Sequence, residues 1–164
     1  MKELIYLYIG NIGRDIKECG IEFSNRYKVF YNKKRKTIYI EKKLENNNVD
    51  YGKNINNLKL LVGRNGCGKS TILDLLGTIR DDREIEFPVL VTKNCSWFAL
   101  YHLYDNIFVI EGYNPNMILE VQDKCEIYLK KEYSAVIKYD MKKKSILEVY
   151  PLQEYHIKGL TLGV

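Results

Sequence analysis

Residues 60–71 read LLVGRNGCGKST, and this stretch decides the fold that we expect for the chain. Gly63, four free positions, and then Gly68, Lys69 and Ser70 match every fixed place of the phosphate-binding P-loop pattern. The glycines allow a tight turn in which successive N–H groups converge on one anion. Lys69 would supply positive charge for the β- and γ-phosphates, and the Ser70 hydroxyl would ligate Mg²⁺. The residues expected to hold the nucleotide are Gly63, Arg64, Asn65, Gly66, Cys67, Gly68, Lys69, Ser70 and Thr71.

The sequence on either side of the loop fits a strand, a loop and a helix in that order. A short apolar run at residues 58–62 is typical of a strand buried on both faces of a parallel sheet. Thr71 begins a predicted helix whose positive N-terminal end faces the phosphates. The apolar face of that helix consists of Ile72, Leu73, Leu75, Leu76 and Ile79. Residues 58–79 therefore predict an α/β fold with a P-loop NTPase core, and the alternative is a chance glycine-rich turn between two elements.

The rest of the chain favours antiparallel strands flanking this unit. Strands are predicted at 3–9, after Gly20 (Ile21, Phe23 and Tyr27), and at 37–42. A β-rich segment covers 96–150, with hairpins pairing 96–104 with 107–112 and Ser134–Tyr139 with Ser145–Tyr150. The 164 residues are expected to form a single ATP-binding domain or half-domain over 1–164.

Composition limits the classes of protein that remain. No apolar run of about 18 residues is present, and the N-terminus lacks a signal-peptide pattern, so we expect a cytoplasmic protein with no membrane partner. The four cysteines are widely spaced, which argues against a zinc site or a disulfide framework. Cys67 is either a small filler of the loop or an oxidisable thiol. The net charge of +5 comes mainly from lysine, and the runs at 33–36 and 142–144 fit solvated hairpin tips or phosphate-backbone contacts.

The layout resembles one branch of the P-loop ATPases. The loop lies behind two or three strands, and residues 62–74 (VGRNGCGKSTILD) are similar to the ABC-type heads of SMC/RecF-like, AAA-family ATPases. Residues 4–11, followed by Ile-Glu-Phe-Ser at 21–24, look like the opening of those heads. The resemblance implies the N-terminal lobe of an ABC head that binds ATP and Mg²⁺. It also implies a second ATPase lobe or a homodimer partner, because family members place ATP between the P-loop of one head and a serine-glycine signature of the other.

Most of the remaining family machinery is missing from the sequence. There is no Gly-Gly pair for a signature loop, and a Q-loop would have to use Gln122 or Gln153, each of which is otherwise an ordinary surface glutamine. The nearest match to Walker B is residues 107–111, in which Glu111 would hold Mg²⁺ or polarise the attacking water. Ile110 fills the usual aspartate position, which weakens this assignment. His102 and His156 have no pattern that assigns them a catalytic role.

The expected function is therefore ATP binding through the P-loop by a half-head that needs a second lobe or partner for hydrolysis. Two alternatives remain open at this point. One is a non-catalytic interaction module derived from a decayed ATPase. The other is a self-sufficient small P-loop NTPase or kinase that uses Glu111. DNA or RNA binding is also open, and no motif supports it.

Overall fold

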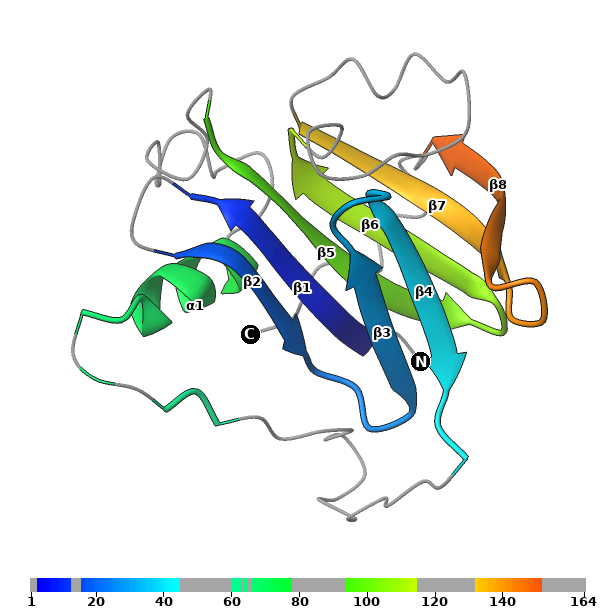
Figure 1. Ribbon diagram of the computed structural model, residues 1–164, viewed down its shortest axis with the longest axis horizontal. Helices are drawn as coiled ribbons and strands as arrows, with labels where there is room; N and C mark the ends of the chain where they lie inside the picture. Colours follow the sequence, from blue (N-terminus) through cyan, green and yellow to red (C-terminus); the bar gives the residue numbers. More distant parts are fainter. Residues whose placement is uncertain are drawn as a thin grey trace.

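The computed structural model describes residues 3–12, 16–44, 60–62, 64, 66–77, 94–114 and 132–151 (Figure 1). These segments contain eight strands and one helix. In chain order they are β1 (Glu3–Asn11), β2 (Lys17–Glu22), β3 (Tyr27–Asn32), β4 (Thr37–Lys42), α1 (Lys69–Gly77), β5 (Ser96–Tyr104), β6 (Ile107–Tyr113), β7 (Glu132–Asp140) and β8 (Ser145–Pro151). The predictions for Gly63, Asn65, Ile79, Gln122, Gln153 and His156 lie outside the described residues.

Six of the strands form one antiparallel sheet in the order β2-β1-β5-β6-β7-β8, and β3 and β4 form a separate hairpin. Four of the five pairings within the sheet join strands that follow one another among the described elements. The exception is β1 with β5, where Leu7 lies opposite Ala99. The sheet therefore consists of two antiparallel units, β1–β2 and β5–β8, each made of consecutive described strands. The pairing of β1 with β5 is the seam that joins them.

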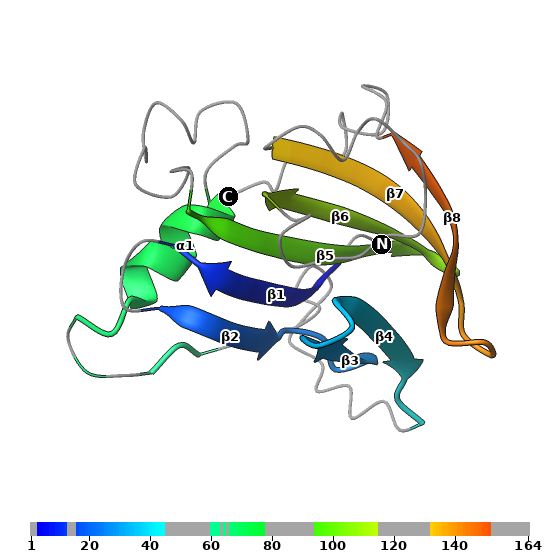
Figure 2. The same ribbon diagram turned by 45° about the horizontal axis from the view of Figure 1, so that its top comes forward.

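The two faces of the sheet bury different sets of side chains, because successive residues of a strand point to opposite faces. One face carries Tyr8, Phe98, Phe108 and Ile137, and the β3–β4 hairpin covers it. The hairpin contributes Tyr27, Val29, Ile38 and Ile40 to that cluster. The other face carries Leu7, Trp97, Tyr101 and Val109, and α1 packs on it through Ile72 and Leu75. Figure 2 shows α1 and the hairpin on opposite sides of the sheet, which gives three layers.

The expected α/β fold with a P-loop NTPase core is wrong. The described sheet is antiparallel throughout, and residues 60–62, which the structure describes before the loop, are not part of a strand. Leu60 is 84% exposed and Val62 is 81% exposed, whereas a central parallel strand would bury both. The short apolar run was misread because periodicity alone cannot identify a buried strand of so few residues. The core positions of the sheet are filled instead by the long alternating strands β1, β5, β6 and β7.

The predicted helix after the loop and most of the predicted strands are confirmed. Strands over 3–9 and 37–42, and the hairpins within 96–112 and 134–150, all lie within strands of the structure. The second strand was misplaced, since β2 begins at Lys17, before Gly20, and ends at Glu22, while Tyr27 begins a separate strand. On α1, Ile72 and Leu75 are buried as expected, but Leu73 is 59% exposed. None of the described residues belongs to a helix with the length and apolar character needed to cross a lipid bilayer.

At Gly112 the strands β5 and β6 approach each other closely. Gly112 lies opposite Phe98 in the β5–β6 pairing. A Cβ at this position would lie 2.4 Å from the Trp97 carbonyl oxygen, which is backbone and cannot turn away. A side chain here would push β5 and β6 apart, so this position requires glycine.

Candidate functional site

The described part of the loop adopts a conformation that depends on its glycines. Gly66 and Gly68 have φ of +81° and +89°, a region that residues with a Cβ rarely enter. The Cys67 amide donates to the Arg64 carbonyl oxygen at 3.3 Å and closes the turn. A Cβ on Gly68 would lie 2.0 Å from the Cδ1 of Ile16, so the loop packs directly against the residue that precedes β2. The loop is a tight turn, and it leads without a gap into α1.

Lys69 is the first residue of α1, and its side chain turns back over the loop. Its Nζ donates to the Arg64 carbonyl oxygen at 2.9 Å and lies 3.8 Å from the Cys67 Sγ. A cation at a helix N-terminus opposes the helix dipole, and the first turn of α1 contains no acidic residue. The ammonium group, the helix N-terminus and the two left-handed glycines thus concentrate positive potential at one exposed turn.

The two hydroxyl residues after Lys69 lie in different environments. Ser70 is exposed, so its hydroxyl is accessible from solvent next to the loop. Thr71 is 2% exposed and belongs to the buried side of α1 with Ile72. Arg64, Gly66 and Cys67 are exposed. The accessible groups around the turn are thus Arg64, Cys67, Lys69 and Ser70, while Thr71 helps to seat the helix.

Glu111 lies within β6, between two antiparallel neighbours. It is opposite Ala99 of β5 and Ser134 of β7, and it is half-buried. A Walker B acid belongs at the carboxyl end of a parallel core strand, and that setting is absent from the sheet described here. The catalytic role of Glu111 stays a prediction that rests on the apolar run before it, residues 107–110.

A second cluster of polar side chains, which sequence reasoning did not find, links β1, the β2–β3 turn and β5. Glu3, whose side chain is 8% exposed, accepts hydrogen bonds from the Ser24 Oγ at 2.6 Å and the Arg26 Nε at 2.9 Å. The Ser24 Oγ in turn accepts from the backbone amides of Arg26 and Tyr27 at 3.0 and 3.1 Å. These bonds fix the turn that carries the chain from β2 into the hairpin. The only sequence signal was Ser24 itself, a typical turn residue before the polar Asn25.

His102 of β5 completes this cluster, and its partners assign its tautomer. Its Nδ1 lies 3.4 Å from the Arg26 Nη2, which can only donate, so Nδ1 accepts. Its Nε2 lies 3.1 Å from the Asp105 carbonyl oxygen and 3.1 Å from the Tyr27 hydroxyl, so Nε2 carries the proton. Burial, reinforced by the Arg26 charge, lowers the pKa of His102, while the Asp105 carbonyl and Glu3 act against this change. The neutral imidazole is therefore the form that fits the site.

Protonation of His102 is expected to destabilise the fold. Since the pKa is lower in the folded than in the unfolded chain, the unfolded chain takes up the proton first as pH falls. The contribution of His102 is fully present above its ordinary pKa of about 6.5 and is lost as pH drops from there through the folded pKa. Urea unfolding of wild type and His102→Gln between neutral and mildly acidic pH measures this effect. The free energy of unfolding of wild type should exceed that of His102→Gln by less and less as pH falls. A difference that does not change with pH would contradict the assignment. His156 is present in both proteins, so its titration does not affect the comparison.

The structure brings the sequence-predicted residues Arg64, Gly66, Cys67, Gly68, Lys69 and Ser70 together at one exposed turn, with Thr71 behind them in the core. Within the described ranges no group of three or more His, Cys, Asp or Glu side chains is placed to hold a metal ion. Any Mg²⁺ would thus rely on Ser70 and on oxygens of the nucleotide itself. When the chain is compared with known proteins, no family model matches it, and no curated protein or solved structure matches it.

Proposed function

We propose that the protein binds Mg·ATP through the loop at 63–71. Lys69 neutralises charge on the β- and γ-phosphates, and Ser70 ligates Mg²⁺. The observation that carries the proposal is the junction between loop and helix. Gly66 and Gly68 both have positive φ, α1 starts at the next residue, and the Lys69 ammonium group lies back over the turn.

The ligand-free contact of Lys69 supports this assignment. Lys69 is half-buried, and its charge at a helix N-terminus is unfavourable as long as no anion lies nearby. A polyphosphate would replace the Arg64 carbonyl as a partner of the Lys69 Nζ and would make the positive charge favourable there. The local sequence is therefore explained better by an anionic ligand than by the stability of the free protein.

The proposed activity is nucleotide binding, with hydrolysis dependent on a second ATPase lobe or on a partner chain. A loop and a Mg²⁺ ligand position phosphates, but turnover also needs a group that orients the attacking water. Glu111 lacks the parallel-strand setting of such a group. The resemblance of residues 62–74 to SMC/RecF-like heads provides the reason to expect a partner.

Isothermal titration of the protein with Mg·ATP, Mg·ADP and AMP tests the proposal. Binding of ATP and ADP with a much weaker response to AMP is expected, because the loop is proposed to hold the β-phosphate. A coupled phosphate-release assay on the same samples should show negligible turnover. Failure of all three nucleotides to bind would refute the proposal, and rapid turnover by the isolated chain would favour a self-sufficient NTPase that uses Glu111.

A further inference from the structure

The positive charge of the protein is concentrated on the β3–β4 hairpin. Residues 27–44 contain seven lysines and arginines and one acid, Glu41, which makes a net charge of +6. The whole chain carries +5, so the remaining residues sum to −1. A lysine-rich composition spread evenly along the chain would not produce this distribution. The charge is therefore a property of one element of the fold and creates a local positive field.

The one acid of the hairpin is neutralised from the neighbouring turn. Lys144, at the end of the β7–β8 turn, forms an ion pair with Glu41. The Asp140 Oδ1 fixes that turn by accepting from the backbone amides of Lys142 and Lys143, at 2.8 and 3.0 Å. The basic surface thus continues from the hairpin onto a second, ordered turn.

Some cations of the hairpin have an acidic partner and others do not. Lys33 is paired with Glu18, and the Lys43 Nζ lies 3.8 Å from the Glu22 carboxylate. Within the part of the chain that the structure describes, four exposed lysines of the hairpin form no ion pair. They are Lys28, Lys34, Lys36 and Lys42. These charges are available to a polyanion without breaking a contact of the folded protein.

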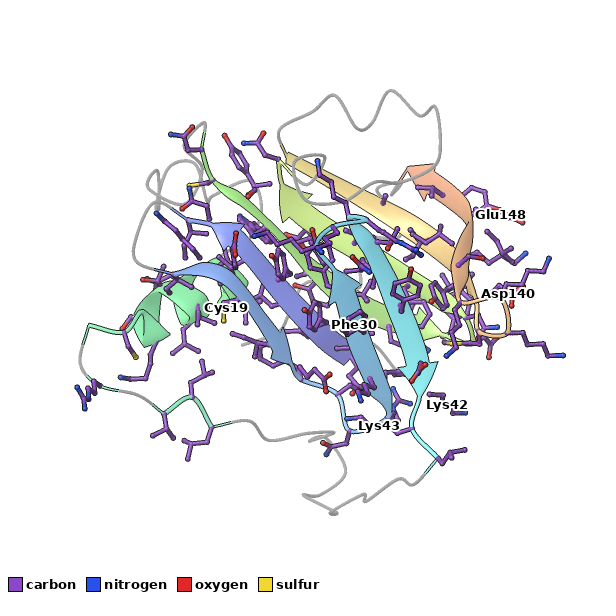
Figure 3. All side chains as sticks on the ribbon, viewed as in Figure 1. Cys19, Phe30, Lys42, Lys43, Asp140 and Glu148 are labelled. Carbon is purple, nitrogen blue, oxygen red and sulfur yellow. The ribbon has the colours of Figure 1, made fainter. Side chains whose placement is uncertain are left out.

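An aromatic pair lies on the outward face of the same hairpin. Phe30 and Tyr39 are directly opposite each other, with ring centroids 6.2 Å apart and planes inclined by 37°. Phe30 is 60% exposed, although the inner face of the same two strands is buried against the sheet. The pKa of the Tyr39 hydroxyl is lowered by its polar neighbours Thr37 and Arg35. Figure 3 shows Phe30 in the middle of the hairpin, with Lys42 and Lys43 at its end.

We propose that the outer face of the β3–β4 hairpin binds single-stranded nucleic acid. Phe30 and Tyr39 stack with unpaired bases. Lys28, Lys34, Arg35 and Lys36 contact the phosphates on either side. Exposed aromatic rings within a cationic strand surface provide the two features that such binding requires. A duplex keeps its bases stacked on each other and offers no free face to the rings. A bilayer would require a larger apolar area than one ring pair surrounded by charges.

This proposal does not depend on nucleotide binding at the loop, because it uses a different face of the molecule. The hairpin covers one face of the sheet and α1 the other. Either activity can be lost without the other. The proposal goes beyond a phosphate contact by the lysine runs, since it assigns base stacking to Phe30 and Tyr39.

Fluorescence anisotropy with labelled oligo(dT) and oligo(U) of about 20 nucleotides, long enough for one binding site, tests the proposal. Phe30→Ala should weaken binding roughly tenfold. Phe30→Leu, which keeps apolar bulk but has no ring, should weaken binding similarly, while Phe30→Trp should retain it. Tyr104→Ala is the matched control, since Tyr104 is 56% exposed and lies on β5, and it should bind as wild type does. Comparison of the two oligonucleotides shows whether the strand bound more tightly is DNA or RNA.

Salt dependence separates phosphate contacts from stacking. The double variant Lys34→Ala/Lys36→Ala should reduce the slope of log affinity against log salt by about 1.4, while Phe30→Ala should leave the slope unchanged. A duplex of the same length and vesicles containing phosphatidylserine are the competing ligands. The proposal is overturned if neither oligonucleotide binds, if Phe30→Ala binds as wild type does, or if the duplex or the vesicles bind more tightly than the single strands.

Discussion

Replacing Lys69 by alanine is expected to lower the affinity for Mg·ATP by about 100-fold and to leave the ligand-free protein at least as stable as wild type. The lost interaction is a charge-assisted contact with phosphate oxygens, which is worth about 2.7 kcal/mol. In the ligand-free protein the variant loses the contacts of the Lys69 Nζ, among them the hydrogen bond to the Arg64 carbonyl oxygen. It also loses an unfavourable charge at the N-terminus of α1 and gains a strong helix former, which compensates for that bond.

Titration calorimetry and urea unfolding of the same variant check the two halves of this prediction. Lys142→Ala is the matched control, because Lys142 is an exposed lysine in the β7–β8 turn, and it should change neither quantity. If Lys69→Ala binds ATP as tightly as wild type does, the loop is not the nucleotide site. If the variant unfolds much more easily, Lys69 has a structural role that the ligand-free geometry does not explain.

Removal of the Glu3 carboxylate is expected to have the largest effect on stability. Glu3→Ala leaves the Arg26 guanidinium and the Ser24 hydroxyl without their acceptor in a part-buried site. Breaking a buried ion pair by removing one partner costs about 3–5 kcal/mol. Because the Arg26 side chain is 35% exposed and water can reach it, we expect about 2–3 kcal/mol. The hairpin should also become less firmly held, since the same bonds fix the β2–β3 turn.

Urea denaturation followed by the fluorescence of Trp97, the one tryptophan of the chain, measures the free energy of unfolding. Glu148→Ala is the control, because its pair with Lys138 at 3.3 Å joins two side chains that are nearly half exposed. That control should change stability by less than about 0.5 kcal/mol. The double variant Glu3→Ala/Arg26→Ala should lose less than the sum of the two single changes, since both remove the same interaction. Strict additivity would show that the two side chains do not depend on each other.

The hairpins could be predicted from the sequence because their signals are local. Asp105-Asn106 and Asp140–Lys144 separate alternating apolar runs, and the structure has a turn at both places. Each register follows from a short turn, so no distant part of the chain is needed to specify it. The helix beginning at Lys69 was predictable for the same reason, from its glycine loop and its spaced apolar residues.

The parallel core strand was predicted wrongly because its assignment depended on distant partners. A run such as 58–62 becomes a central strand only if other strands flank it, and the sequence alone does not show which do. The buried polar cluster was missed for a related reason. Glu3, the pair Ser24 and Arg26, and His102 come from three places in the chain, and none of them stands out in its own segment. Their juxtaposition exists only after β1 and β5 have paired.

The seam between β1 and β5 has a consequence for how the protein is made. The β5–β6 and β7–β8 hairpins and the β1–β2 pair each involve neighbouring strands and can form early. The seam closes a loop of about ninety residues, measured from Leu7 to Ala99, and such long closures slow folding. During synthesis the N-terminal strands leave the ribosome well before their partner exists. Until β5 arrives, β1 presents an unpaired apolar edge, and the growing chain must be kept from joining another copy of itself at that edge.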